Sequence, residues 1–174
     1  MRHGRVVAAI AAIALPVAGC GGGGSENEGD DARLSKAQLI QKADEICGKF
    51  NVLNDRLRAR GPSADPTAPS ASERTRKKAA EVLRAFAANV RKEAGELGVL
   101  RPPVRARAGF DGMIRRLDEF ADHLVNAAEA VARNERRAFV RELAAAQRVS
   151  PVRDRFPARY GFRICGRAVT QQPA

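Results

Sequence analysis

The side chains best suited to chemistry form a small patch of carboxylates and one histidine. Glu119 and His123 are four residues apart, as are Asp118 and Asp122, so a helix would place each pair on one face. Glu119 and His123 could together contact one cation. A di-iron site in a bundle, however, needs carboxylates from four helices and two Glu-x-x-His motifs, and a zinc site would also lack ligands. We therefore predict no metal and no cofactor, and interpret the patch as a solvated acidic face.

Nucleophilic catalysis has little support in the sequence. No Gly-x-Ser-x-Gly motif is present, and Ser63, Ser70 and Ser72 lie in a proline-rich segment and at a helix start, where serine is an ordinary turn or capping residue. Gly21–Gly24 precede neither a strand nor a Lys-Ser/Thr pair, so they do not form a phosphate-binding loop. We predict that the protein is not an enzyme.

The first twenty residues resemble the signal peptide of a bacterial lipoprotein. Arg2 and Arg5 precede a short apolar run, and small residues lead directly to Cys20. In such proteins a diacylglyceryl group, carrying chains such as palmitate, alkylates the cysteine, and the peptide before it is removed. Residues 1–19 are then the signal peptide, and Cys20 anchors the protein to the extracytoplasmic side of the cell membrane. The alternatives are a chance cysteine after an ordinary signal or a buried N-terminal helix.

Residues 20–33 are predicted to form a flexible tether behind the lipidated cysteine. Four glycines are followed by a polar, acidic stretch with no large apolar side chain to bury. A coil of this length has a root-mean-square span of roughly 20 Å. The folded part would then remain close to the membrane.

The other two cysteines, Cys47 and Cys165, can form only one intramolecular pair if Cys20 carries lipid. A disulfide between them would close a loop over most of the chain, for which the chain-entropy model gives about 4 to 5 kcal/mol. The alternative is a pair of free thiols with redox or metal chemistry. No Cys-x-x-Cys motif and no nearby histidine supports that alternative, so we favour the disulfide.

The charge balance suggests an anionic partner. Lys and Arg number 31 against 20 Asp and Glu, a formal charge of +11. The candidate contact residues form three clusters: Arg74, Arg76, Lys77 and Lys78; Arg101, Arg105 and Arg107; and Arg133, Arg136 and Arg137. They could contact an anionic envelope polymer, lipid head groups or a partner protein, or they could simply solvate helix surfaces. Export and the scarcity of stacking aromatic residues argue against nucleic acid.

The spacing of the apolar residues and the presence of capping residues predict helices, which would position these groups. Ser35 and Gln38 form a capping box for a helix from Lys36 to about Arg60, with Leu39, Ala43, Ile46, Phe50, Leu53 and Leu57 on its buried face. Ser70 and Glu73 suggest a second capping box, for a helix that ends at Gly98.

Two further helices follow the break at Pro102-Pro103. The first carries apolar residues from Phe110 to Val131. Asn134 is predicted to cap the second, which would bury Phe139, Val140, Leu143 and Ala146 and break after Val149, since Pro151 and Pro157 interrupt the pattern.

These patterns predict an all-α protein whose residues 34–168 form an antiparallel up-down four-helix bundle, with a disordered tail at 169–174. We expect a monomer. An extended coiled coil is the alternative, but the breaks between the helices divide its pattern. Five inward alanines favour close helix approach: Ala43, Ala79, Ala94, Ala127 and Ala128.

Three motifs resemble segments of small, uncharacterised helical lipoproteins of high-GC actinobacteria. They are Lys42–Cys47, Leu100–Pro103 and Tyr160–Gly166. They accompany the lipobox, which is the run of small residues that ends at Cys20, and the glycine-rich tether. The resemblance covers about residues 35–166. It implies a helical fold with one disulfide rather than an activity.

Two functions remain open. The first is a membrane-anchored lipoprotein that acts as a structural or interaction module of the cell envelope. The alternative is a carrier that holds a small apolar molecule between its helices, and this would require a cavity.

Overall fold

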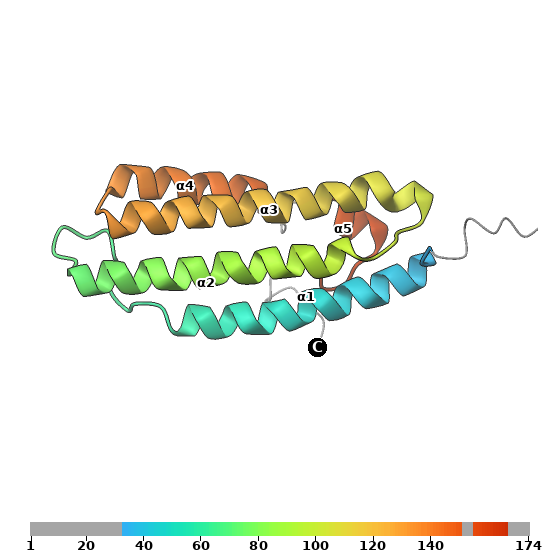
Figure 1. Ribbon diagram of the computed structural model, residues 1–174, viewed down its shortest axis with the longest axis horizontal. Coiled ribbons are helices and arrows are strands. Elements are labelled where there is room, and N and C mark those ends of the chain that lie inside the picture. The colour runs from blue at the N-terminus through green and yellow to red at the C-terminus, as the bar shows by residue number, and fades with distance from the viewer. Residues whose placement is uncertain (1–32, 151–154, 167–174) are drawn as a thin grey trace, which may run out of the picture. The chain divides into compact units, whose positions relative to one another are not determined.

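The computed structural model describes residues 33–150 and 155–166, and within these ranges the fold is all-α (Figure 1). The helices are α1 (Lys36–Ala59), α2 (Glu73–Gly98), α3 (Val104–Ala132), α4 (Arg136–Val149) and the short α5 (Arg155–Tyr160). The predicted signal peptide, all of the tether except Arg33, and the C-terminal tail lie outside the described residues.

The first helix begins where the sequence predicts. The Ser35 hydroxyl accepts a hydrogen bond from the Gln38 backbone N–H, and the Gln38 side chain accepts one from the Ser35 N–H, so the capping box is complete. The helix ends at Ala59, just before Gly61-Pro62.

The predicted start of α2 is wrong in one detail. Ser72 rather than Ser70 is the N-cap, and its hydroxyl oxygen lies 3.1 Å from the backbone nitrogen of Thr75, which donates to it. Ala71 donates to the carbonyl of Ala68 at 2.9 Å, so the chain is still turning at Ser70. The capping box predicted for Ser70 and Glu73 therefore does not form.

Asn134 ends α3 rather than capping α4. Its φ is 60°, a left-handed conformation that asparagine tolerates better than most residues. The Asn134 N–H donates to Val131 at 3.1 Å and the Glu135 N–H to Ala130 at 2.8 Å, which is the Schellman pattern of a helix C-terminus. The N-cap of α4 is Glu135, which makes no side-chain capping bond.

The helices pack in chain order, α1 on α2, α2 on α3 and α3 on α4 (Figure 1). Their contacts are built on small side chains: the five alanines predicted to face inward are all at most 6% exposed. On α4, Phe139 and Ala146 are buried as predicted, and Leu143 is partly buried against the apolar cluster that contains Phe139. Val140 is 54% exposed, so its predicted burial is wrong.

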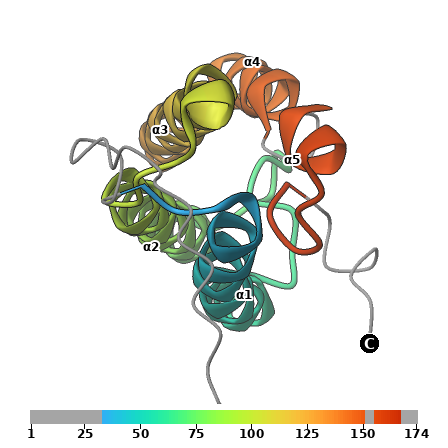
Figure 2. The same ribbon diagram turned by 90° about the vertical axis from the view of Figure 1, so that its right-hand side faces the viewer.

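The C-terminal segment packs between α1 and α3 at one end of the helices (Figure 2). Phe162 is fully buried, with ring centroids 6.4 Å from Phe110 and 5.3 Å from Tyr160. Gly109 of α3 lies directly against the Phe156 ring, where a Cβ atom would overlap it. The break predicted after Val149 is present, since α4 ends there.

Candidate functional site

The structure brings the three predicted basic clusters to two places. Arg101 lies in the turn between α2 and α3, and Arg105 and Arg107 lie in the first turn of α3. The other two clusters come from the start of α2 and from the turn between α3 and α4. These two meet through the loop before α2, because Pro66 and Thr67 border a small hollow together with Asn134 and Arg136.

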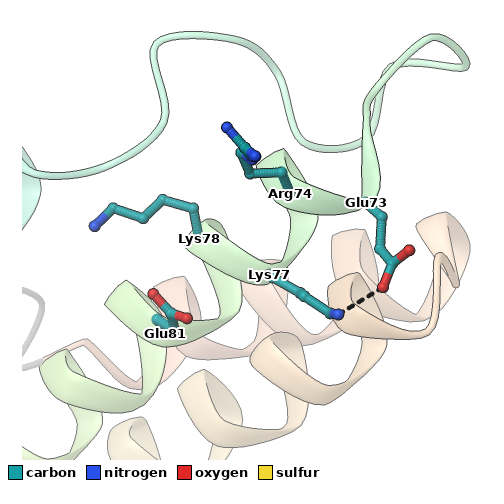
Figure 3. A pocket seen from close by; sticks show the side chains of 5 residues that line it. All are labelled: Glu73, Arg74, Lys77, Lys78 and Glu81. Carbon is teal, nitrogen blue, oxygen red and sulfur yellow. Dashed lines mark ion pairs between the residues drawn. The ribbon is translucent and has the colours of Figure 1, made fainter.

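The start of α2 carries an open pocket of about 420 Å³. Its lining is wholly charged: Glu73, Arg74, Lys77, Lys78 and Glu81 (Figure 3). Lys77 pairs with Glu73 at 2.6 Å, and the hydrogen bond from Lys77 lowers the pKa of that carboxyl and raises the pKa of Lys77 itself. Arg74 and Lys78 remain to attract an anion, but the two carboxylates weaken the attraction.

Arg76 has a structural role. Its side chain is half-buried, and Nη1 donates to the Ala71 carbonyl at 2.6 Å, which holds the loop against α2. Its Nε is buried without a hydrogen-bond partner. Arg76 is therefore a poorer contact for an external anion than its neighbours on α2.

The cluster at the α3–α4 turn is partly neutralised. Arg133 Nε lies 2.9 Å from Glu135, and its Nη1 lies 3.6 Å from Glu129. The hydrogen bond from Arg133 lowers the pKa of Glu135. Asp65 has a pKa lowered mainly by hydrogen bonds from Thr67, with a smaller effect of Arg136.

The carboxylate and histidine patch is arranged differently from the prediction. His123 Nδ1 lies 3.0 Å from Glu142 of α4, not against Glu119, and both partners are mostly buried. The hydrogen bond with His123 lowers the pKa of Glu142. Asp122 pairs with Arg91 of α2 at 2.6 Å. These contacts join neighbouring helices, and the described part of the chain contains no group of three or more residues that could hold a metal ion.

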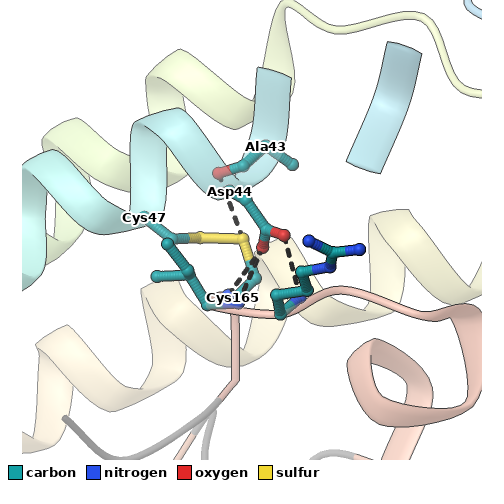
Figure 4. The surroundings of a disulfide bond; sticks show 6 residues. Ala43, Asp44, Cys47 and Cys165 are labelled. Atoms are coloured by element: carbon teal, nitrogen blue, oxygen red, sulfur yellow. Dashed lines mark hydrogen bonds between the residues drawn. A yellow bond between two sulfur atoms is a disulfide. The ribbon is translucent and has the colours of Figure 1, made fainter. Parts of the chain in front are cut away.

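Cys47 and Cys165 form the predicted disulfide (Figure 4). Asp44, one turn before Cys47, accepts hydrogen bonds from three consecutive backbone N–H groups, those of Arg163, Ile164 and Cys165, at 2.8 to 3.0 Å. The carboxylate thus supplies hydrogen-bond acceptors for the backbone N–H groups of a segment that is not helical. Asp44 is not among the site residues predicted from the sequence, although its place three residues before Cys47 puts it on the buried face of α1.

Two further polar residues are buried, Asn54 of α1 and Glu93 of α2. Asn89 donates to Asn54 at 3.3 Å. Glu93 is 8% exposed, and no other residue within the described ranges forms a hydrogen bond or ion pair with it. Burial, with a smaller effect of Glu96, raises the pKa of Glu93 to about 8. The spacing could have revealed it, because Phe86, Val90, Glu93 and Leu97 follow the 4-3-4 pattern of a buried face.

Comparison with known proteins adds no assignment: no family model, no curated protein and no solved structure matches the chain. None of the helices within residues 33–150 and 155–166 is both long and apolar enough to cross a membrane.

Proposed function

We propose that the protein is a lipoprotein, anchored through Cys20 to the outer side of the cell membrane, that acts as an interaction module of the envelope. The observation that carries this proposal is the pairing of Cys47 with Cys165. It leaves Cys20 as the third cysteine, directly after an apolar segment and small residues. A disulfide is typical of proteins outside the reducing cytoplasm, which agrees with export.

Binding rather than catalysis agrees best with the described residues. Charged side chains line the pocket at the start of α2, and the helix contacts contain alanines that bring the backbones close together. Close packing of this kind opposes the carrier function, which requires a cavity of about 300 to 1,000 Å³ lined mainly by apolar side chains. The exposed lysines and arginines supply the contacts for an anionic envelope component or a partner protein.

The finer fold that accompanies this proposal is an antiparallel up-down four-helix bundle. Sequential packing of α1 to α4 supports it. So do the short connections at residues 99–103 and 133–135, because short links between long helices favour antiparallel neighbours. This arrangement agrees with the side-by-side helices of Figure 1.

The anchor is tested with a Cys20→Ser variant in a bacterial host that processes lipoproteins. We expect wild-type protein to incorporate labelled palmitate and to remain with washed membranes, and the variant to do neither. A Cys47→Ser/Cys165→Ser double variant is the control, because it removes two thiols but keeps the acylation site. Equal labelling of wild type and Cys20→Ser would overturn the proposal.

The interaction is tested by crosslinking the anchored protein in intact envelopes and identifying the crosslinked peptides. We expect crosslinks from lysines of the charged pocket, Lys77 and Lys78, to an envelope component. Crosslinks confined to residues within the same chain, at saturating reagent, would contradict an interaction function.

A further inference from the structure

Three segments that are distant in sequence meet at one end of the helical unit. They are residues 33–43, 98–110 and 155–166. The Leu34 N–H donates to the carbonyl of Arg101 at 2.8 Å, which joins the first two. The Lys36 ammonium lies 5.2 Å from the Tyr160 ring centroid, and Gly109 contacts Phe156, so the third segment joins both. We call these three segments the entry end, because the described chain enters the helical unit there (Figure 2).

The entry end is strongly basic. Its three segments contain nine lysines and arginines and no aspartate or glutamate. The acidic residues that directly follow two of the segments do little to offset this charge. Asp44 is buried and accepts three backbone N–H groups, and Asp111 lies 3.7 Å from Arg107, one of the nine basic residues. At the opposite end, residues 55–81 and 129–137 contain ten basic and six acidic residues, several of them in ion pairs.

The entry end also exposes apolar side chains between its arginines. Val99 is 77% exposed and Val104 is 66% exposed, and they flank the Arg101–Pro103 turn. Only two other large hydrophobic residues of the described ranges, Val52 and Val140, are exposed in this way. Basic side chains interleaved with exposed apolar ones are characteristic of surfaces that enter the head-group region of a bilayer. A hydrated wall polymer would contact the arginines but would not bury the apolar side chains of the valines.

The geometry points to the entry end as a docking surface for anionic phospholipid. This inference rests on the proposed lipid anchor, because a coil of the length predicted for the tether has a root-mean-square span of roughly 20 Å and would keep the entry end near the bilayer. At that distance the helical unit would be close to the membrane without contacting it. Lys36, Arg101, Arg105 and Arg159 would contact the head groups, and Val99 and Val104 would enter the boundary below them. The charged pocket of α2, at the other end, would then face away from the membrane.

The surface is tested without the anchor, so that the lipid chain does not conceal it. Residues 20–174 carrying Cys20→Ser, the mature chain without its acyl group or its apolar signal peptide, are mixed with vesicles of phosphatidylcholine alone or with 30% phosphatidylglycerol, and binding is measured by cosedimentation. We expect binding to the anionic vesicles, with a loss at high salt, because salt screens exposed charges. Equal binding to neutral vesicles, or no binding at all, would overturn the inference.

Two pairs of matched variants locate the surface. Arg101→Glu/Arg105→Glu/Arg159→Glu should weaken vesicle binding on the order of a hundredfold. Arg74→Glu/Lys78→Glu/Arg137→Glu, the same charge change at the opposite end, should weaken it much less. Equal losses in the two triple variants would show that net charge alone drives binding and would contradict a specific surface.

The valines distinguish lipid from polymer. Val99→Ser/Val104→Ser should weaken binding to anionic vesicles on the order of tenfold, whereas the control Val52→Ser/Val140→Ser should not. Binding to a soluble anionic polymer without binding to vesicles would refute the lipid assignment. Palmitate labelling of the wild type distinguishes this inference from the proposed function. Labelling without vesicle binding would contradict the docking surface but not the lipid anchor. Vesicle binding without labelling would contradict the lipid anchor but not the docking surface.

Discussion

Replacing Glu93 with glutamine should stabilise the protein at neutral pH. Glu93 is 8% exposed, and its pKa is raised from 4.5 to about 8 by burial. In the unfolded chain the carboxyl is ionised at pH 7, so folding must bind a proton there. This costs about 1.4 kcal/mol for each pH unit between the unfolded pKa and the working pH. At pH 7, 2.5 units above the unfolded pKa of 4.5, the cost is about 3.4 kcal/mol, and glutamine, which is neutral and of the same size, avoids it.

The assay is urea unfolding with the disulfide intact at several pH values from 4 to 9. A raised folded pKa means that the stabilisation is fully present below pH 4.5 and is lost progressively as the pH rises to about 8. Wild-type stability should fall across that window, and the fall should be smaller in Glu93→Gln. The control is Glu129→Gln, which changes an exposed carboxylate that contacts Arg133 at the other end of the helices. A Glu93→Gln variant no more stable than wild type at pH 7, or an unchanged pH profile, would refute the reasoning.

Three further predictions concern the helix ends and the disulfide region. Asp44→Asn should lower the free energy of unfolding by about 2 to 4 kcal/mol, since hydrogen bonds to a charged acceptor contribute about 1.5 to 3 kcal/mol each. Hydrogen exchange should accelerate at the backbone N–H groups of residues 163–165. Unchanged exchange there would contradict the role of Asp44. Gly109→Ala should destabilise the protein by about 1 to 3 kcal/mol because its Cβ overlaps the ring of Phe156. The control Gly112→Ala, whose Cβ would lie 3.7 Å from the nearest side chain, should be neutral or stabilising by up to about 1 kcal/mol, and equal effects at the two glycines, measured by urea unfolding, would refute the contact. Asn134→Gly should preserve or raise the melting temperature and Asn134→Val should lower it, because the residue has a φ of 60°; the opposite order would show that the Asn134 side chain matters more than its backbone.

The helices were predictable because each signal is local. The capping box at Ser35 depends on residues within one turn, and the breaks at Gly61 and Gly98 depend on backbone properties of those segments. The errors at Ser70 and Asn134 arose where two local signals compete. Asn134 can cap a following helix or end a preceding one, and only the path of the chain decides between them.

The polar contacts of the site could not be predicted because they join distant elements. The i, i+4 spacing suggested Glu119 as the neighbour of His123, but packing of α4 on α3 brings Glu142 there. Asp44 accepts hydrogen bonds from backbone N–H groups. Because nearly every residue has such a group, the side chains of that segment do not indicate that Asp44 contacts it. The basic clusters were visible along the chain, but their division between two ends, and the convergence of three segments at the entry end, follow from tertiary packing.

Mass spectrometry of the mature N-terminus from purified membranes tests the central claim most directly. The lipoprotein proposal predicts that the protein begins at Cys20, that this residue carries a diacylglyceryl group, and that Cys47 and Cys165 are joined. An N-terminus that retains residues 1–19, or an unmodified Cys20 in membrane-bound protein, would contradict it.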